Sequence, residues 1–287
     1  MSMRQFLLAA ATALVAGPVA AVALTSVQLI ERPAKPSPAG LGVDGPKGVM
    51  YFRSGSSAPS CGLLPRGGTE IAPLLEPDEG SDFPQCSGFV GAVRFNWAGH
   101  TVYVVRFLQR DTAEDTSDSD VALGAGPAGL ARPEGVDQGA MPSHKPLNTV
   151  AAWVKAQLVG LDDAKAGFKP SERDAALVDS AFLAVAVDPA GARCRLTTGT
   201  IALDAAPTPT VVPCGAVLAT TGFVSGATAW FIALLRAADG HAVAQVFSAG
   251  ATAAGPAPEF DARLAAAAAS GKILPVRNAL RKLVAAH

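Results

Sequence analysis

The sequence contains few charged residues and no excess of either sign. Only 16% of its 287 residues are charged, and the formal net charge is −1. Binding to nucleic acid or to an anionic membrane surface depends on a clear excess of positive charge, which attracts such ligands over a long range. The composition therefore gives no reason to expect a nucleic acid or a membrane surface as partner.

The sequence also lacks the short motifs of common catalytic and nucleotide-binding sites. It contains no Gly-x-Ser-x-Gly, no His-Glu-x-x-His and no Walker-type glycine loop. No two cysteines have the Cys-x-x-Cys spacing that is frequent in zinc sites. These absences favour a non-catalytic protein, and we expect no cofactor and no metal.

Long apolar runs are absent outside the N-terminus. Arg4 precedes an apolar run over residues 6–16, and the small residues Ala21 and Ala23 flank Val22 in a small-x-small pattern. This order is typical of a cleaved secretory signal peptide of residues 1–23, and the run is short for a membrane span. An uncleaved anchor is the alternative. We expect a periplasmic or secreted protein without stable membrane insertion after cleavage, in which the Pro- and Gly-rich residues 24–47 form a tether.

Export changes the interpretation of the four cysteines, Cys61, Cys86, Cys194 and Cys214. An even number of cysteines in an exported chain indicates disulfide bonds. The spacings favour pairing of neighbours, Cys61 with Cys86 and Cys194 with Cys214, although three connectivities are formally possible. A zinc site is the alternative, but the histidines lie elsewhere in the sequence.

The clearest local pattern is a β-hairpin over residues 86–107. Apolar residues alternate along residues 89–95, and the sequence Asn-Trp-Ala-Gly at residues 96–99 supplies a turn. Residues 101–107 are rich in β-branched and aromatic side chains, which suit a half-buried strand. Gly99 can adopt the positive φ that such a turn requires.

Several short motifs recur in the same order in the two halves of the chain. An apolar segment at residues 49–54 and one at residues 182–187 stand at matching distances from Cys61 and Cys194. Proline then precedes the second cysteine of each pair, Gly-Phe-Val recurs at residues 88 and 222, and Gly-His recurs at residues 99 and 240. We interpret this order as an internal duplication of a mainly β unit, with chance similarity as the alternative.

The fold class that we predict is α+β, with mainly antiparallel strands. Two duplicated disulfide-pinned β units, over residues 48–161 and 162–287, would each be followed by helix. Helices are expected at residues 148–161, at residues 261–270 and from Pro275 onward. The last helix has a basic face, which could bind a membrane or partner but more often belongs to a helix that covers a sheet.

The first unit includes an acidic, Gly- and Pro-rich segment at residues 111–146. We expect this segment to be a solvated loop with few apolar residues to order it. A calcium loop is the alternative, but the acidic residues around Asp118 and Asp120 lack the spacing of a calcium-binding loop.

Few residues are candidates for a functional site. His100 and His241 each follow a glycine at an expected hairpin corner, and with Asp239 they could form a metal or acid–base site if the two units pack together. Histidines that merely suit a turn are the alternative. Trp97, at the expected hairpin tip, is a candidate aromatic anchor for a partner, unless it folds back onto its own sheet.

These observations favour an exported, non-catalytic binding protein whose partner is another protein rather than a small molecule. One version of this function is an immunity-type protein that protects against a toxin. An exported hydrolase or metalloenzyme with a site between the repeats is the first alternative. A structural protein of the cell envelope is the second.

Overall fold

The computed structural model describes residues 85–126, 129–170, 175–204 and 207–286, together with the backbone of four short strands before them. The fold is mixed α+β, and every described strand pairing is antiparallel. The expected signal peptide at residues 1–23 lies outside the described residues. So does most of the expected tether at residues 24–47, within which only β1 (Val27–Leu29) is described as a strand.

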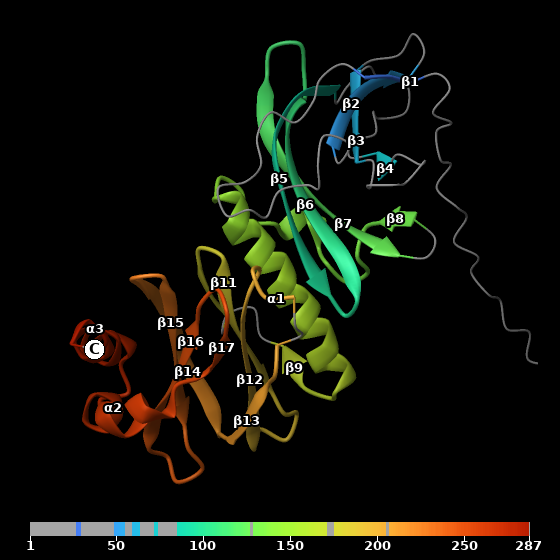
Figure 1. Ribbon diagram of the computed structural model, residues 1–287. Coiled ribbons are helices and arrows are strands. Elements are labelled where there is room, and N and C mark those ends of the chain that lie inside the picture. The colour runs from blue at the N-terminus through green and yellow to red at the C-terminus, as the bar shows by residue number, and fades with distance from the viewer. Residues whose placement is uncertain are drawn as a thin grey trace, which may run out of the picture.

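The first half of the chain forms two four-stranded meanders and a helix (Figure 1). The first sheet contains β1, β2 (Val49–Ser54), β3 (Pro59–Leu63) and β4 (Ala72–Pro73). The second sheet contains β5 (Gln85–Trp97), β6 (His100–Arg110), β7 (Thr116–Gly126) and β8 (Gly129–Ala131). A helical turn, η3 (Gln138–Ala140), leads to the long helix α1 (Leu147–Lys165).

The second half also runs through two sheets before it ends in helices. The third sheet contains β10 (Ala176–Val178), β11 (Ala181–Val187), β12 (Arg193–Thr200) and β13 (Thr210–Pro213), and β9 (Lys169–Pro170) pairs with β11. The fourth contains β14 (Ala216–Ser225), β15 (Thr228–Arg236), β16 (Ala242–Ala249) and β17 (Ala254–Pro256). The helical elements η5 (Pro258–Phe260), α2 (Asp261–Ala268) and α3 (Ile273–Ala285) follow.

Helix α1 lies between the β5–β8 sheet and the β11–β12 hairpin, as the green helix at the centre of Figure 1 shows. Alternation along β11 explains how one strand serves two layers. Phe182 and Ala184 pack against α1, whereas Leu183 and Val185 pack against the β14–β17 sheet. The far face of that last sheet is covered by α2 and α3. Helix α1 therefore has β-structure on two sides, and two of its charged residues, Lys155 and Asp163, are buried.

The hairpin predicted over residues 86–107 is present as β5 and β6. Ala98 and Gly99 form the turn with φ values of 49° and 80°, and Trp97 is the strand partner of His100. Positive φ at both central residues gives the twist that joins two antiparallel strands tightly. Two register shifts near the start of β5 interrupt the simple alternation that the sequence suggested.

The prediction of a solvated loop over residues 111–146 is wrong for a large part of that segment. Residues 116–124 belong to β7, which pairs with β6 along its length. Arg106 lies directly opposite Asp120, and its Nε and Nη2 atoms donate to the carboxylate at 2.8 and 2.7 Å. A bidentate pair of this kind offsets the charge that made the segment appear unsuited to a sheet.

The predicted helices are present, with small changes at their ends. The helix expected at residues 148–161 extends from Leu147 to Lys165, and its N-cap is Pro146, without a side-chain capping hydrogen bond. The two C-terminal helices are α2 and α3. Val276 and Leu280 of α3 are fully buried against the β14–β17 sheet, so this helix covers a sheet despite its basic outer face.

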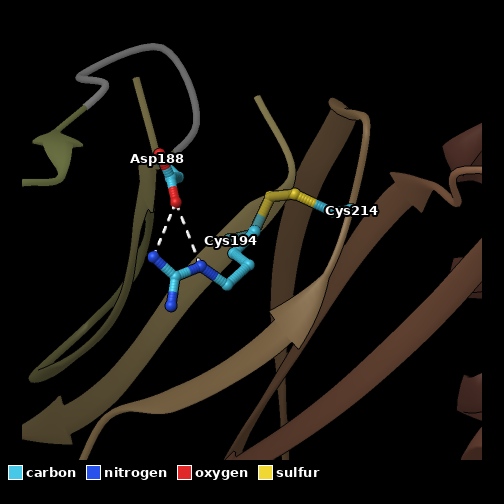
Figure 2. Close-up of a disulfide and its surroundings, with 4 residues drawn as sticks. Asp188, Cys194 and Cys214 are labelled. Atoms are coloured by element: carbon cyan, nitrogen blue, oxygen red, sulfur yellow. Dashed lines mark hydrogen bonds and ion pairs between the residues drawn. A yellow bond between two sulfur atoms is a disulfide. The ribbon is translucent and has the colours of Figure 1, made fainter. Parts of the chain in front are cut away.

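The disulfide between Cys194 and Cys214 is present, as we predicted, and joins β12 to the segment between β13 and β14. Figure 2 shows it beside Asp188, which pairs with Arg193 across the β11–β12 turn. Both cysteines are buried within the core between the last two sheets. The side chains of Cys61 and Cys86 lie outside the described part of the structure, so the pairing predicted for them stays a prediction.

The structure does not confirm the internal duplication, because two of the recurring motifs occupy different places in the two halves. Gly99-His100 lies at the turn between the first two strands of its sheet, whereas Gly240-His241 lies between the second and third strands of its own. Gly88 is near the start of β5, whereas Gly222 is near the end of β14. The Gly-His and Gly-Phe-Val motifs therefore do not occupy equivalent positions in the two halves.

Candidate functional site

Helix α1 carries two charged residues that are almost completely buried, Lys155 and Asp163, each with a relative exposure of 1%. The Nζ atom of Lys155 donates to the main-chain carbonyl oxygens of Thr200 at 2.9 Å and Leu203 at 2.7 Å. It also lies 5.5 Å from the ring centroid of Phe95, a distance typical of a cation–π contact. The ammonium thus links α1 to the end of β12 and to the β5–β8 sheet.

Burial lowers the pKa of Lys155 to about 8, because desolvation disfavours its charged form, and the negative charge of Asp204 opposes this only in part. The side chain lines a cavity of about 220 Å³ at the junction of α1, β12 and the β16–β17 turn. The lining consists of Lys155, Thr198, Gly199, Thr200, Leu203, Pro207, Thr208, Thr252, Ala253 and Ala254. We call this space the Lys155 cavity.

Asp163 lies two turns further along α1 and pairs with Arg195 of β12. The Nε atom of Arg195 is 2.9 Å from the nearer carboxylate oxygen. The angle at this contact falls outside hydrogen-bond geometry, so the two groups form an ion pair without a well-directed hydrogen bond. Arg195 also lies over the ring of Phe168 at 5.8 Å from its centroid.

The environment of Asp163 raises its pKa to about 6. Desolvation is the main cause, Arg195 opposes it, and the neighbouring Asp162 adds to it. The carboxylate borders a second cavity, of about 250 Å³, lined largely by small and apolar residues of α1 and β11. Arg195 already pairs with this carboxylate. We therefore interpret the ion pair as a structural link between α1 and β12.

The structure places His100, His241 and Asp239 on the surface and gives no sign of a common site. His100 is exposed beside the β5–β6 turn. His241 lies 3.2 Å from Asp239 within the β15–β16 turn, where both side chains are largely exposed. The described residues include no group of three or more His, Cys, Asp or Glu side chains that could hold a metal ion. The Asp239–His241 contact is local to one turn, and it lowers the pKa of Asp239 through hydrogen bonds from the backbone and side chain of His241.

Trp97 folds back onto the protein instead of projecting from the hairpin tip. Its half-buried ring packs on the cluster that includes Phe95 and Val102, and also on a second cluster that includes Ala156 and Phe182. The alternative given for Trp97, that it folds back onto its own sheet, is therefore the arrangement found in the structure. The ring is half-buried rather than fully exposed, and its role as a partner anchor stays a prediction.

Sequence reasoning missed Lys155, although a signal was present. Lys155 is the only charged residue among residues 147–161, and it interrupts an otherwise apolar and small-residue helix. A single lysine on such a helix usually extends its amine to solvent. That rule fails here because α1 has β-structure on both sides, which the sequence pattern of the helix alone does not reveal.

Comparison with the models of known protein families and with curated proteins finds no match for this chain. Of the helices that the structure describes, none has both the length and the apolar character required to cross a bilayer.

Proposed function

We propose that this chain is an exported, non-catalytic binding protein that recognises a protein partner, and that the Lys155 cavity is its recognition site. The observation that carries this proposal is a buried, fixed ammonium beside an open cavity at the junction of the two halves. Binding sites are usually concave and carry a few well-placed polar groups, and this cavity has that character.

The way in which Lys155 is held supports binding rather than chemistry. Two of its three N–H donors are used by carbonyl oxygens, so the amine is kept in position with one donor left. An amine that acts as a nucleophile must be free to lose its protons and approach a carbon atom. A fixed cation is better suited to recognising an acidic group of a partner.

The disulfide supports the exported location in this proposal. Disulfide bonds form and persist in oxidising compartments, so Cys194–Cys214 is compatible with an extracellular or periplasmic protein. The test of export is the mass of the protein recovered from its native compartment. Loss of residues 1–23 supports cleavage at the expected site, and a full-length chain retained in the cytoplasm contradicts the proposal.

Partner binding is tested by affinity capture from an envelope extract of the cells that produce the protein. The complex is then reconstituted with the purified partner. Wild-type protein and Lys155→Met are compared, with Lys165→Met as control, because Lys165 lies on the same helix but is exposed. We expect a saturable complex with wild type and Lys165→Met and a weaker one with Lys155→Met. A partner that is a toxin, neutralised on binding, would establish the immunity-type version.

Two other results would replace this proposal. Hydrolytic activity that is lost in both His100→Ala and His241→Ala while the fold survives would identify the protein as an enzyme. Recovery of the protein only with the insoluble cell-wall fraction, without a saturable partner, would identify it as a structural protein of the envelope.

We also infer that the two halves derive from a duplicated unit. The support is that each half runs through two antiparallel sheets before it ends in helix, although the third sheet has five strands and the others have four. The test is an experimentally determined structure that includes the first sheet. Superposition of the halves strand by strand, with α1 matched to the C-terminal helices, is the expected result, and different crossing angles of the paired sheets would contradict it.

A further inference from the structure

We propose that the Lys155 cavity binds a carboxylate group, which takes the remaining N–H of Lys155 and main-chain N–H groups of β12. This inference rests on the proposed binding function and names the chemistry recognised at the same site. The carboxylate could belong to a free small molecule or to a protein partner, and the experiment below separates these two sources.

The first argument is charge. Among the described residues that line the cavity, Lys155 is the only charged one, and both atoms that accept its hydrogen bonds are neutral carbonyl oxygens. Asp204 attracts this ammonium through its charge alone and is not among the residues that line the cavity. A buried cation without a directly bonded anion is costly, and an anion with good geometry removes much of that cost. A single carboxylate matches the single positive charge, whereas a doubly charged phosphate would leave negative charge uncompensated.

The second argument is the free edge of β12. Strand β13 pairs with β12 only as far as Leu196, so Thr198 and Thr200 lie beyond its end. In an antiparallel strand the N–H and C=O of one residue point to the same side, and the side alternates from residue to residue. The Thr200 carbonyl points toward Lys155, so the N–H groups of Thr200 and Thr198 point to the same side.

The third argument is size. A volume of about 220 Å³ equals the share of about seven liquid water molecules at roughly 30 Å³ each. This space accommodates a carboxylate with a short chain, but not a folded segment of a partner. Thr208 and Thr252 are exposed members of the lining, so they form its mouth, and Lys155 is at its base. A ligand therefore enters with its carboxylate first.

The experiment measures binding of defined carboxylates to the full exported protein by calorimetry and by amide chemical shifts. The probes are propionate, its neutral analogue propionamide, and one short N-acetylated peptide with uncharged side chains and either a free or an amidated C-terminus. We expect the carboxylate forms to bind, with shifts at Thr198 and Thr200, and the amide forms to bind at least tenfold more weakly. Equal binding of acid and amide forms would overturn the proposal.

Variants then test the role of charge. Lys155→Met should weaken carboxylate binding at least tenfold, and Lys165→Met should not change it. Because Lys155→Met could impair folding, Thr252→Glu provides a second test at an exposed position, with Thr252→Gln as the matched neutral control. We expect only Thr252→Glu to weaken binding, by repulsion at the mouth. Equal affinities of the Glu and Gln variants, or of Lys155→Met and wild type, would overturn the proposal.

The probes also identify the source of the carboxylate. Tighter binding of the free-ended peptide than of propionate indicates a carboxylate carried by a protein, and the opposite order indicates a small molecule. Either order supports carboxylate recognition. If no carboxylate binds but the partner complex still forms and is insensitive to Lys155→Met, this inference fails while the broader binding function stands. If neither carboxylate binding nor a partner complex is observed, both this inference and the proposed binding function are wrong.

Discussion

The Nε atom of Arg195 lies 2.9 Å from a carboxylate oxygen of Asp163, and this contact links helix α1 to strand β12. Asp163 is 1% exposed, so the carboxylate has little access to water that could replace its partner. The contact therefore has a stronger effect on stability than an ion pair on the surface.

We predict that Arg195→Met destabilises the protein by about 3 kcal/mol at pH 8, because it leaves a buried carboxylate unpaired. The loss should be smaller at pH 5, since the pKa of Asp163 is already raised to about 6 and rises further without Arg195. Urea denaturation at the two pH values measures this. Arg193→Met is the control, because the Arg193 guanidinium is largely exposed. An equal loss in both variants would contradict this account.

The second prediction concerns Asp261, whose Oδ1 accepts a hydrogen bond from the Val246 N–H at 2.9 Å. Burial raises its pKa from 3.8 to about 6. The folded protein therefore holds more protons than the unfolded chain between these values, and the contribution of Asp261 to stability falls as the pH rises through this window. In Asp261→Asn, the unfolding free energy should lose this component of its pH dependence.

Asp239→Asn is a control, because the contribution of Asp239 to stability changes with pH in the opposite direction to that of Asp261. The pKa of Asp239 is lowered by hydrogen bonds from His241, so its contribution is lost as the pH falls. Thermal melts from about pH 3 to about pH 7 should show the two variants diverging from wild type in opposite directions. If melting temperature changes with pH in the same way in Asp261→Asn and in wild type, the raised pKa does not belong to Asp261.

The third prediction concerns the disulfides. Non-reducing peptide mapping should find Cys194 joined to Cys214, and we predict Cys61 joined to Cys86. Reduction of the first bond opens a loop with a sequence separation of 20 residues, which corresponds to a loss of about 3 kcal/mol. A bond between the two halves, such as Cys86 with Cys194, would contradict the mapping.

The fourth prediction compares Trp97 with the two exposed histidines. Trp97→Ala should destabilise the protein by about 2 kcal/mol, because the half-buried ring leaves a cavity between β5 and α1. His100→Ala and His241→Ala should change the melting temperature much less, since surface substitutions usually have small effects. If Trp97→Ala weakens partner capture while its melting temperature is unchanged, the ring is an anchor after all.

The fifth prediction uses limited proteolysis of the acidic segment. The first cleavage should fall at residues 111–115 or 132–146 and not within residues 116–124, which are paired with β6. Arg106→Met removes the partner of Asp120 and should make β7 a cleavage site. Early cleavage of β7 in the wild-type protein would contradict the strand assignment.

Local sequence patterns were sufficient for many of the elements. The alternation and turn chemistry of residues 86–107 predicted the β5–β6 hairpin. Apolar stripes predicted α1 and α3, and an Ala-rich run predicted α2, each within a few residues. The cysteine spacing predicted the Cys194–Cys214 bond. These features depend on contacts between residues that are near one another in the sequence, so the sequence contains most of the information that specifies them.

Only the tertiary structure decided the features that depend on distant neighbours. Asp118 and Asp120 belong to a strand because residues 116–124 pair with β6, where Arg106 lies opposite Asp120. Trp97 is half-buried because α1 and β11 pack beside the hairpin tip. Lys155 is a buried cation at a cavity because α1 is enclosed between two layers of β-structure, and Thr200 and Leu203, which hold its amine, lie 45 and 48 residues away. A side chain's burial and charge environment are set by packing across such distances, and no local pattern in the sequence records them.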